Sequence, residues 1–121
     1  MNADSTAGAD GNIALTEVTD NFMVGLINAG TANVTLSADD SILEAAGDAA
    51  GVADILGATI TLNTGRDLDG VPGGETGNIL GEGGVGTAIE IDATTQFNAD
   101  SNTLQAVFNV CLLYTSDAAD E

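Results

Sequence analysis

The chain has 121 residues, a formal net charge of −18 and a single basic residue, Arg66. Such a surface repels phosphate backbones and anionic membranes, which argues against nucleic acid as a partner. No apolar run reaches the roughly eighteen residues of a membrane span, so membrane insertion is not expected. The apolar residues are mostly small and branched aliphatics, with few aromatics. That composition suits a narrow column of stacked aliphatics better than a compact globular core.

A short alternating phrase returns along the chain. It consists of a small residue, a β-branched residue, a spacer and a second aliphatic, so the two aliphatics fall on one face of a strand. Its copies recur about every twenty to thirty residues, which is the period of a solenoid coil. The copies are residues 11–16, 32–37, 58–63 and 88–93. The pattern predicts an all-β fold, a parallel β-helix (β-solenoid).

Residues 1–10 are polar and lack a period, so we expect a frayed N-terminal segment. A strand then begins at Gly11, with Ile13 and Leu15 on its inward face. From here to residue 110 we expect stacked coils.

The next strand is expected over residues 22–28, after a turn cluster. Phe22, Val24 and Leu26 are predicted to share one face, and Met23 and Ile27 the other.

The second coil copies the first. Its strand at residues 33–38 has Val34 and Leu36 inward. Offsets of about twenty residues separate Ile13 from Val34 and Phe22 from Ile42, which predicts that the two coils stack.

The third coil begins after an Ala-rich stretch, residues 45–56. Its apolar spacing could be helical, but Gly47 and Gly51 disfavour a helix, and we expect a loop followed by a short strand at residues 53–56. The phrase at 58–63 predicts the next strand.

Residues 65–86 are Gly-rich and contain the only Pro, which predicts an irregular insertion. Within it, Ile79 and the following Leu are expected to form a very short strand. Ile89 and Ile91 restart the alternation, and Phe97 is expected to point inward.

Residues 111–121 resemble a translated sequencing adaptor rather than natural protein sequence, and we set them aside like an expression scar. We therefore expect the natural reading frame to continue past about Val110. The tail holds the only Cys, Cys111, so the natural segment offers no disulfide framework or Cys-based metal site.

Calcium is the one metal for which the sequence offers candidates. Asp67 and Asp69 precede Gly70 as in an EF-hand loop, although the first and last ligand positions of that alignment carry Gly and Thr. Asp39 and Asp40 form an acidic turn. Their hard oxygen atoms suit weak calcium binding, and no other cofactor is indicated.

No catalytic residue is predicted. Residues 81–86 match G-x-G-x-x-G, but a strand-like segment follows them where a dinucleotide site needs a helix. Adjacent acids on a turn point apart and do not provide the converging carboxylates of a glycosidase.

Thr35, Thr59 and Thr61 raise the possibility of a flat threonine array for ice or polysaccharide. Only the last two have the paired T-x-T form, which favours ordinary strand-surface threonines.

Residues 11–17, 34–43 and 84–92 resemble repeats of very large bacterial surface proteins, the filamentous-haemagglutinin-like adhesins and related β-helical exoproteins. The resemblance implies a right-handed parallel β-helix, export to the cell surface, and a role as stalk or adhesive fibre. It transfers no functional residue to this chain.

The leading hypothesis is therefore a non-enzymatic shaft segment of a secreted or cell-surface bacterial adhesin. Its partners would be neighbouring repeats of the same longer chain, because one coil of about twenty residues buries too few aliphatics to offset its conformational entropy. Host or surface glycans are further candidate partners. Two alternatives stay open: a carbohydrate-binding or carbohydrate-cleaving β-helix domain, and a calcium-stiffened surface repeat.

Overall fold

The computed structural model describes residues 1–47, 52–66, 77–82, 88–108 and 113–116, and for 107–108 and 113–116 the backbone alone. Every regular element of these residues is a β-strand, and every strand pair is parallel. The strands are β1 (Ala3–Asp4), β2 (Ile13–Glu17), β3 (Phe22–Val24), β4 (Ile27–Asn28), β5 (Val34–Ala38), β6 (Ile42–Glu44), β7 (Ile55–Asn63), β8 (Asn78–Leu80), β9 (Ile89–Asp100), β10 (Thr103–Leu104), β11 (Ala106–Phe108) and β12 (Leu113–Ser116). The fold is all-β, as the alternation predicted.

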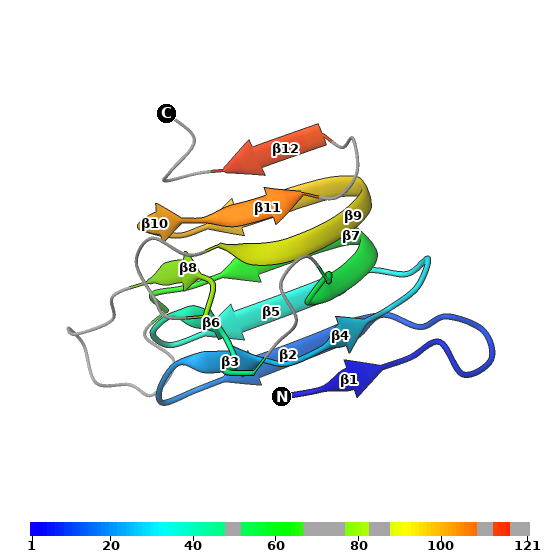
Figure 1. The fold of residues 1–121 in the computed structure, drawn as a ribbon, viewed down its shortest axis with the longest axis horizontal. Helices are drawn as coiled ribbons and strands as arrows, with labels where there is room; N and C mark the ends of the chain where they lie inside the picture. Colours follow the sequence, from blue (N-terminus) through cyan, green and yellow to red (C-terminus); the bar gives the residue numbers. More distant parts are fainter. Residues whose placement is uncertain (48–51, 67–76, 83–87, 109–112, 117–121) are drawn as a thin grey trace.

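The strands stack in three faces. Face 1 contains β1, β4, the first part of β7, the first part of β9 and β11. Face 2 contains β2, β5, the second parts of β7 and β9, and β12, and face 3 contains β3, β6, β8 and β10. The colours of Figure 1 run from blue at one end of the stack to red at the other, because successive coils lie on one another. This arrangement is compatible with a β-solenoid.

The predicted stacking of the first two coils is confirmed. Ile13 lies opposite Val34 on face 2, and Phe22 lies opposite Ile42 on face 3. The next coil continues the first of these columns, with Ile60 opposite Val34. The core is therefore a column of aliphatic side chains between the faces.

The fourth copy of the phrase does not join that column. Ile91 lies opposite Ile55 on face 1, whereas Phe97 takes the position above Ile60 on face 2. The reason is coil length: the chain travels from residue 60 to 97 between these face 2 positions, but only from 34 to 60 in the coil before. Phe97 is fully buried, as predicted.

The single strand expected at residues 22–28 is two strands, β3 and β4, with a corner between them. At this corner Leu26 is 42% exposed and Ile27 is fully buried, the reverse of the predicted facing. The chain turns from face 3 to face 1 at Gly25, where a Cβ atom would collide with the side chain of Asn2. A corner shifts the inward–outward alternation by one residue, so the strand rule fails across it.

The looser segments follow their predictions where the structure describes them. β7 begins at Ile55, inside the short strand expected at 53–56, and β8 contains the expected Ile79. Residues 48–51, 67–76 and 83–87, which include the rest of the predicted loop and insertion, lie outside the described residues.

Both ends of the chain contribute strands. The N-terminal segment that we expected to be frayed contains β1, paired with β4. β12, within the adaptor-like residues 111–121, pairs with β9. A parallel ladder uses backbone groups that every residue carries, so this pairing does not depend on the origin of the sequence.

Asn side chains link one coil to the next where the chain enters face 2. The Asn12 Oδ1 atom accepts a hydrogen bond from the Asn33 backbone N–H at 3.0 Å, and Asn33 Oδ1 accepts one from the Thr59 N–H at 3.1 Å. Asn33 and Thr59 each directly precede the first pair of the ladder to the coil below, Val34 opposite Ile13 and Ile60 opposite Val34, so their N–H groups need acceptors of another kind. The same residue type thus performs the same task on two successive coils.

Asp10 makes a similar link. Its Oδ2 atom accepts hydrogen bonds from the Thr31 N–H at 2.6 Å and the Thr31 hydroxyl at 2.8 Å. Gly30 beside it has a φ of 58°, a conformation that favours glycine. The backbone hydrogen bond from Thr31, followed by the hydroxyl bond, lowers the pKa of Asp10 below its ordinary value.

Replacing Thr31 with Val tests this link. The substitution removes the hydroxyl donor and keeps the backbone donor, so the pKa of Asp10 should rise part of the way toward its ordinary value. Because the folded pKa of Asp10 is lowered, its contribution to stability is present above the unfolded pKa and is lost as the pH falls through the folded pKa. A titration of the Asp10 carboxyl carbon by NMR measures the shift. An unchanged pKa in Thr31→Val would contradict the hydroxyl's role.

Candidate functional site

Three carboxylates from two successive coils converge at the corner between faces 3 and 1: Glu44 and Asp54 at the two ends of one coil's corner, and Glu90 on the next coil. Glu44 ends β6, Asp54 directly precedes β7, and Glu90 is the second residue of β9. One carboxylate oxygen from each lies within 4.8 Å of the others. Asp54 is 1% exposed and Glu44 9%. This group, which we call the corner cluster, is the densest collection of titratable side chains in the described residues.

Asp54 and Glu90 are bound reciprocally. The Asp54 Oδ2 atom accepts a hydrogen bond from the Glu90 N–H at 2.8 Å, and the Asp54 N–H donates to the Glu90 carbonyl at 2.9 Å. The Asp54 carbonyl accepts from the Ile27 N–H of the coil below at 2.8 Å. Asp54 therefore connects three coils at one point.

Glu44, at the other end of the same corner, also accepts a hydrogen bond from the next coil. Its Oε2 atom accepts from the Glu82 N–H at 2.6 Å, and Glu82 Oε2 in turn accepts from the Gly47 N–H at 2.6 Å. A charged acceptor makes such bonds stronger than neutral partners would. The visible chemistry of the corner cluster is thus the capping of backbone N–H groups between coils.

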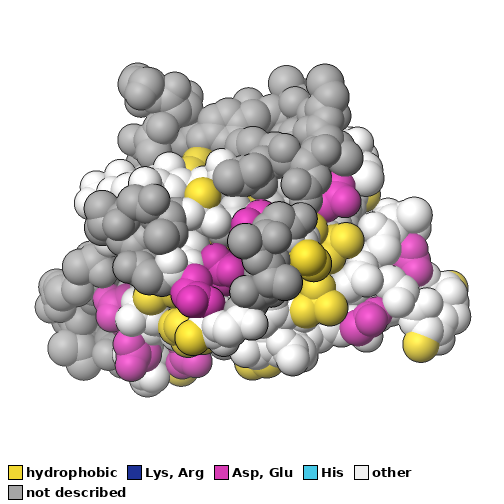
Figure 2. Space-filling view, viewed as in Figure 1, with side chains coloured by type: hydrophobic (Ala, Val, Ile, Leu, Met, Phe, Trp, Pro, Cys, Tyr) yellow, Lys and Arg dark blue, Asp and Glu magenta, His cyan; other side chains and the backbone are white. Residues whose placement is uncertain are grey.

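The electrostatic cost of the corner cluster is repulsion among like charges. Like charges at such separations repel each other, and the repulsion is screened less where water is excluded. The only basic side chain of the chain, Arg66, pairs instead with Asp100. Acidic side chains are also spread over the face drawn in Figure 2. A calcium ion takes six to eight oxygen ligands, so one oxygen from each carboxylate of the corner cluster would supply about half of a calcium site.

The structure places two of the four predicted calcium candidates. Asp67 and Asp69 fall outside the described residues. Asp39 and Asp40 occupy the turn after β5, where the Asp39 N–H donates to the Glu17 carbonyl at 3.0 Å. Neither belongs to the corner cluster.

Sequence reasoning missed the corner cluster. All three acids stand in segments expected to be strands, Asp54 in the short one at 53–56, and their separations of 10 and 36 residues match no common period. The one available signal was the acid at the end of a strand, since a coil corner exposes N–H groups that need acceptors.

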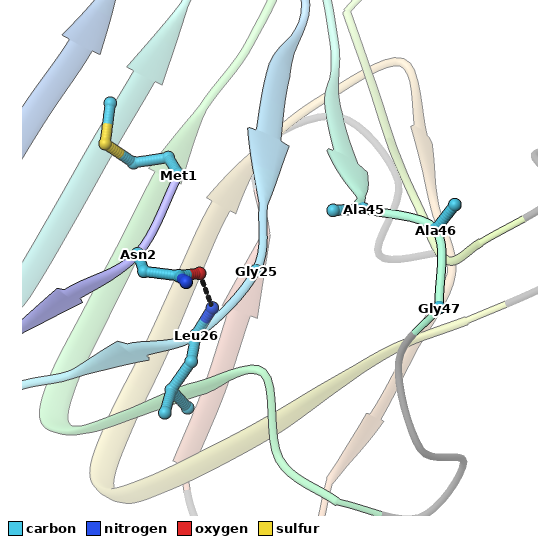
Figure 3. Close-up of a pocket in the computed structure, with 7 residues that line it drawn as sticks. All are labelled: Met1, Asn2, Gly25, Leu26, Ala45, Ala46 and Gly47. Atoms are coloured by element: carbon cyan, nitrogen blue, oxygen red, sulfur yellow. Dashed lines mark hydrogen bonds between the residues drawn. The ribbon is translucent and has the colours of Figure 1, made fainter.

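A shallow hollow lies beside the corner between β3 and β4. Its volume is about 480 Å³, and it is lined by Met1, Asn2, Gly25, Leu26, Ala45, Ala46 and Gly47. Figure 3 shows the Asn2 side chain directed at Leu26, whose N–H donates to Asn2 Oδ1 at 2.8 Å. The lining side chains are apolar apart from the Asn2 amide, and none of them is an acid or a base. The N-terminal amino group of Met1 donates to the Met23 carbonyl at 2.7 Å.

Comparison with known protein families, curated proteins and solved structures finds no match for this chain. Among the described residues there is no helix with the length and apolar character needed to cross a membrane.

Replacing Glu90 with Gln tests the repulsion in the corner cluster. The substitution keeps the shape of the side chain and the backbone bond to Asp54, and it removes one of three neighbouring charges. We expect the free energy of unfolding at pH 7 to rise by about 1 kcal/mol, as partial relief of like-charge repulsion at an effective dielectric constant near 20. Urea denaturation in the presence of a chelator measures it.

Glu17→Gln is the matched control. It makes the same change of charge on face 2, away from the corner cluster, and should alter stability by less than about 0.5 kcal/mol. If Glu90→Gln is no more stable than Glu17→Gln, repulsion within the corner cluster is not a significant cost.

Proposed function

We propose that this chain is a non-enzymatic spacer: a segment of a right-handed parallel β-solenoid that forms the shaft of a secreted or cell-surface bacterial adhesin. In this role the protein acts through its length and rigidity, and its main partners are neighbouring repeats of the same longer chain. The observation that carries the proposal is the regular bonding of each coil to the next.

That bonding supports a spacer because it is continuous along the stack. On face 2 the parallel ladder runs from β2 through β5 and β7 to β9 without a missing strand. The Asn12 and Asn33 side chains repeat one coil-to-coil hydrogen bond on top of this ladder. In such a stack each coil contacts only its neighbours, so the structure extends by adding coils without changing its cross-section.

The core supports the same proposal. Its fully buried side chains are aliphatic apart from Phe97, and they lie in register from coil to coil. Parallel stacking of like residues gives a dry column that resists bending. Export to the cell surface rests on the adhesin-like repeats in the sequence.

Duplication of one coil tests the proposal. We would insert a second copy of residues 12–32 between Ala32 and Asn33, since 21 residues separate the linked residues Asn12 and Asn33. The extra coil should preserve every inward position and lengthen the stack by about 4.8 Å, the spacing of neighbouring strands. The urea m-value should rise by roughly a sixth, in proportion to the added folded chain. Small-angle scattering and urea denaturation measure both quantities.

A scrambled version of the same 21 residues at the same site is the control. It should behave as a long loop, with an unchanged m-value and lower stability. If the true copy behaves like the scrambled one, coils do not add as independent repeat units and the spacer proposal fails.

A further inference from the structure

The outward surface of face 2 differs chemically from the rest of the molecule. The outward positions alternate with the buried ones on β2, β5 and the second parts of β7 and β9. We call this surface the polar face. Its residues are Ala14, Thr16, Thr35, Ser37, Thr59, Thr61, Asn63, Gln96, Asn98 and Asp100.

The strand register arranges these residues in straight rows across the coils. Thr35 lies between Ala14 and Thr61, and Asn98 follows Thr61. Neighbouring rows are two residues apart along each strand. The hydroxyl and amide groups therefore form a flat grid with steps of about 4.8 Å between coils and about 7 Å along the strands.

Hydrogen bonds within the polar face hold this grid in place. The Gln96 Nε2 atom donates to Asn98 Oδ1 at 2.7 Å, and Asn98 Nδ2 donates to Thr61 Oγ1 at 3.3 Å. Asn63 Nδ2 donates to Ser37 Oγ at 3.4 Å. These bonds fix the orientation of amide and hydroxyl groups, which both donate and accept hydrogen bonds.

The polar face also carries no net charge, in a chain whose formal charge is −18. Asp100 is the one acid at its outward positions, and its Oδ2 atom lies 2.5 Å from the Nη2 atom of Arg66. Arg66 also donates to Asn63 Oδ1 at 3.3 Å. The only cation of the chain thus neutralises the only acid of this surface.

Strand propensity explains only part of this composition. Thr is favoured in strands, whereas Asn and Asp are depleted there and Glu is depleted less, so propensity accounts for the threonines and the few acids but not for the amides. Asn63 and Asn98 stand in the middle of the polar face, while acidic residues dominate the sequence elsewhere. The bias is toward groups that both donate and accept hydrogen bonds.

We propose that the polar face binds an uncharged polysaccharide chain, a role that goes beyond the spacer function. Sugar hydroxyls donate and accept, as the Thr, Ser, Asn and Gln side chains do. The negative field of the molecule repels anionic polymers and a second copy of the chain, and leaves a neutral polymer unaffected. The β-sheet backbone beneath is already paired, so recognition runs through side chains. Each coil would make a weak contact with the polysaccharide, and several coils in register would together bind it more strongly.

Affinity electrophoresis of the full chain tests the proposal. In native gels containing hydroxyethyl cellulose or galactomannan, two neutral polymers, the protein should migrate more slowly than an acidic reference protein. In gels containing polygalacturonate it should keep its mobility. Retardation in neither neutral polymer, or equal retardation in polygalacturonate, overturns the proposal.

Two charge-matched variants locate the binding. Thr35→Glu places a charge at the centre of the polar face and should raise the polymer concentration for half-maximal retardation roughly tenfold. Met23→Glu adds the same charge at an exposed position of β3, on face 3, and should change it less than about twofold. If Thr35→Glu melts at a lower temperature than the unsubstituted chain, Thr16→Glu on the edge strand β2 replaces it. The same roughly tenfold rise in the polymer concentration for half-maximal retardation is then expected. Equal effects of the face 2 and face 3 variants overturn the proposal.

Failure here and failure of the spacer proposal are distinguishable. Coil duplication reports on stacking alone, and electrophoresis reports on the polar face in a chain shown by its melting curve to be folded.

Discussion

The structure depends on hydrogen bonds between one coil and the next. A coil of twenty-odd residues has no helix to satisfy its own backbone groups, so each N–H and C=O along a strand must find its partner on a neighbouring coil. The strand ladder is interrupted at the corners, so some backbone N–H groups there have no carbonyl partner in the ladder. Asn12, Asn33, Asp10, Glu44 and Asp54 each accept one of these groups through a side-chain oxygen. The polar residues at the corners are therefore as structural as the aliphatics in the core.

This requirement also explains what the sequence could predict. Alternation and a constant offset identified the pairs Ile13–Val34 and Phe22–Ile42, because the offset between the first two coils is nearly the same on both faces, 21 residues on face 2 and 20 on face 3. Later coils lengthen, and a periodic search then aligns the wrong residues, as it did for the phrase at 88–93. The facing of Leu26 failed for a related reason, because a corner changes the parity of a strand. Local pattern specifies strands and their inward residues, whereas coil length is set by loops that carry no pattern.

The corner cluster could not be predicted from the sequence for the same reason, because the lengths of the coils are not encoded in a repeating pattern. Glu44 and Asp54 meet across the connection from β6 to β7, and Glu90 joins them because β9 stacks on β7, a pairing that the lengthened coil hides from a periodic search. Their hydrogen bonds offset part of the repulsion, since a carboxylate that accepts a backbone N–H is stabilised in its charged form. The acidity of this chain thus has two components. Some carboxylates are needed as acceptors inside the stack, and the others are solvated at the surface.

The polar face differs from the rest of the described surface because acids are nearly absent from its outward positions. In a solenoid the inward positions are fixed by packing and the corners by hydrogen bonding, so the outward strand positions are the ones that stability constrains least. A composition bias there has to come from something other than folding. Acids occupy outward positions of face 1, with Asp4 and Asp92 on the β1 and β9 strands, and face 2 replaces them by amides and hydroxyls. Asp100 is compensated by the only Arg in the chain. The same backbone ladder therefore supports two surfaces of different charge, and a spacer that needed only solubility would have no reason to keep one of them neutral.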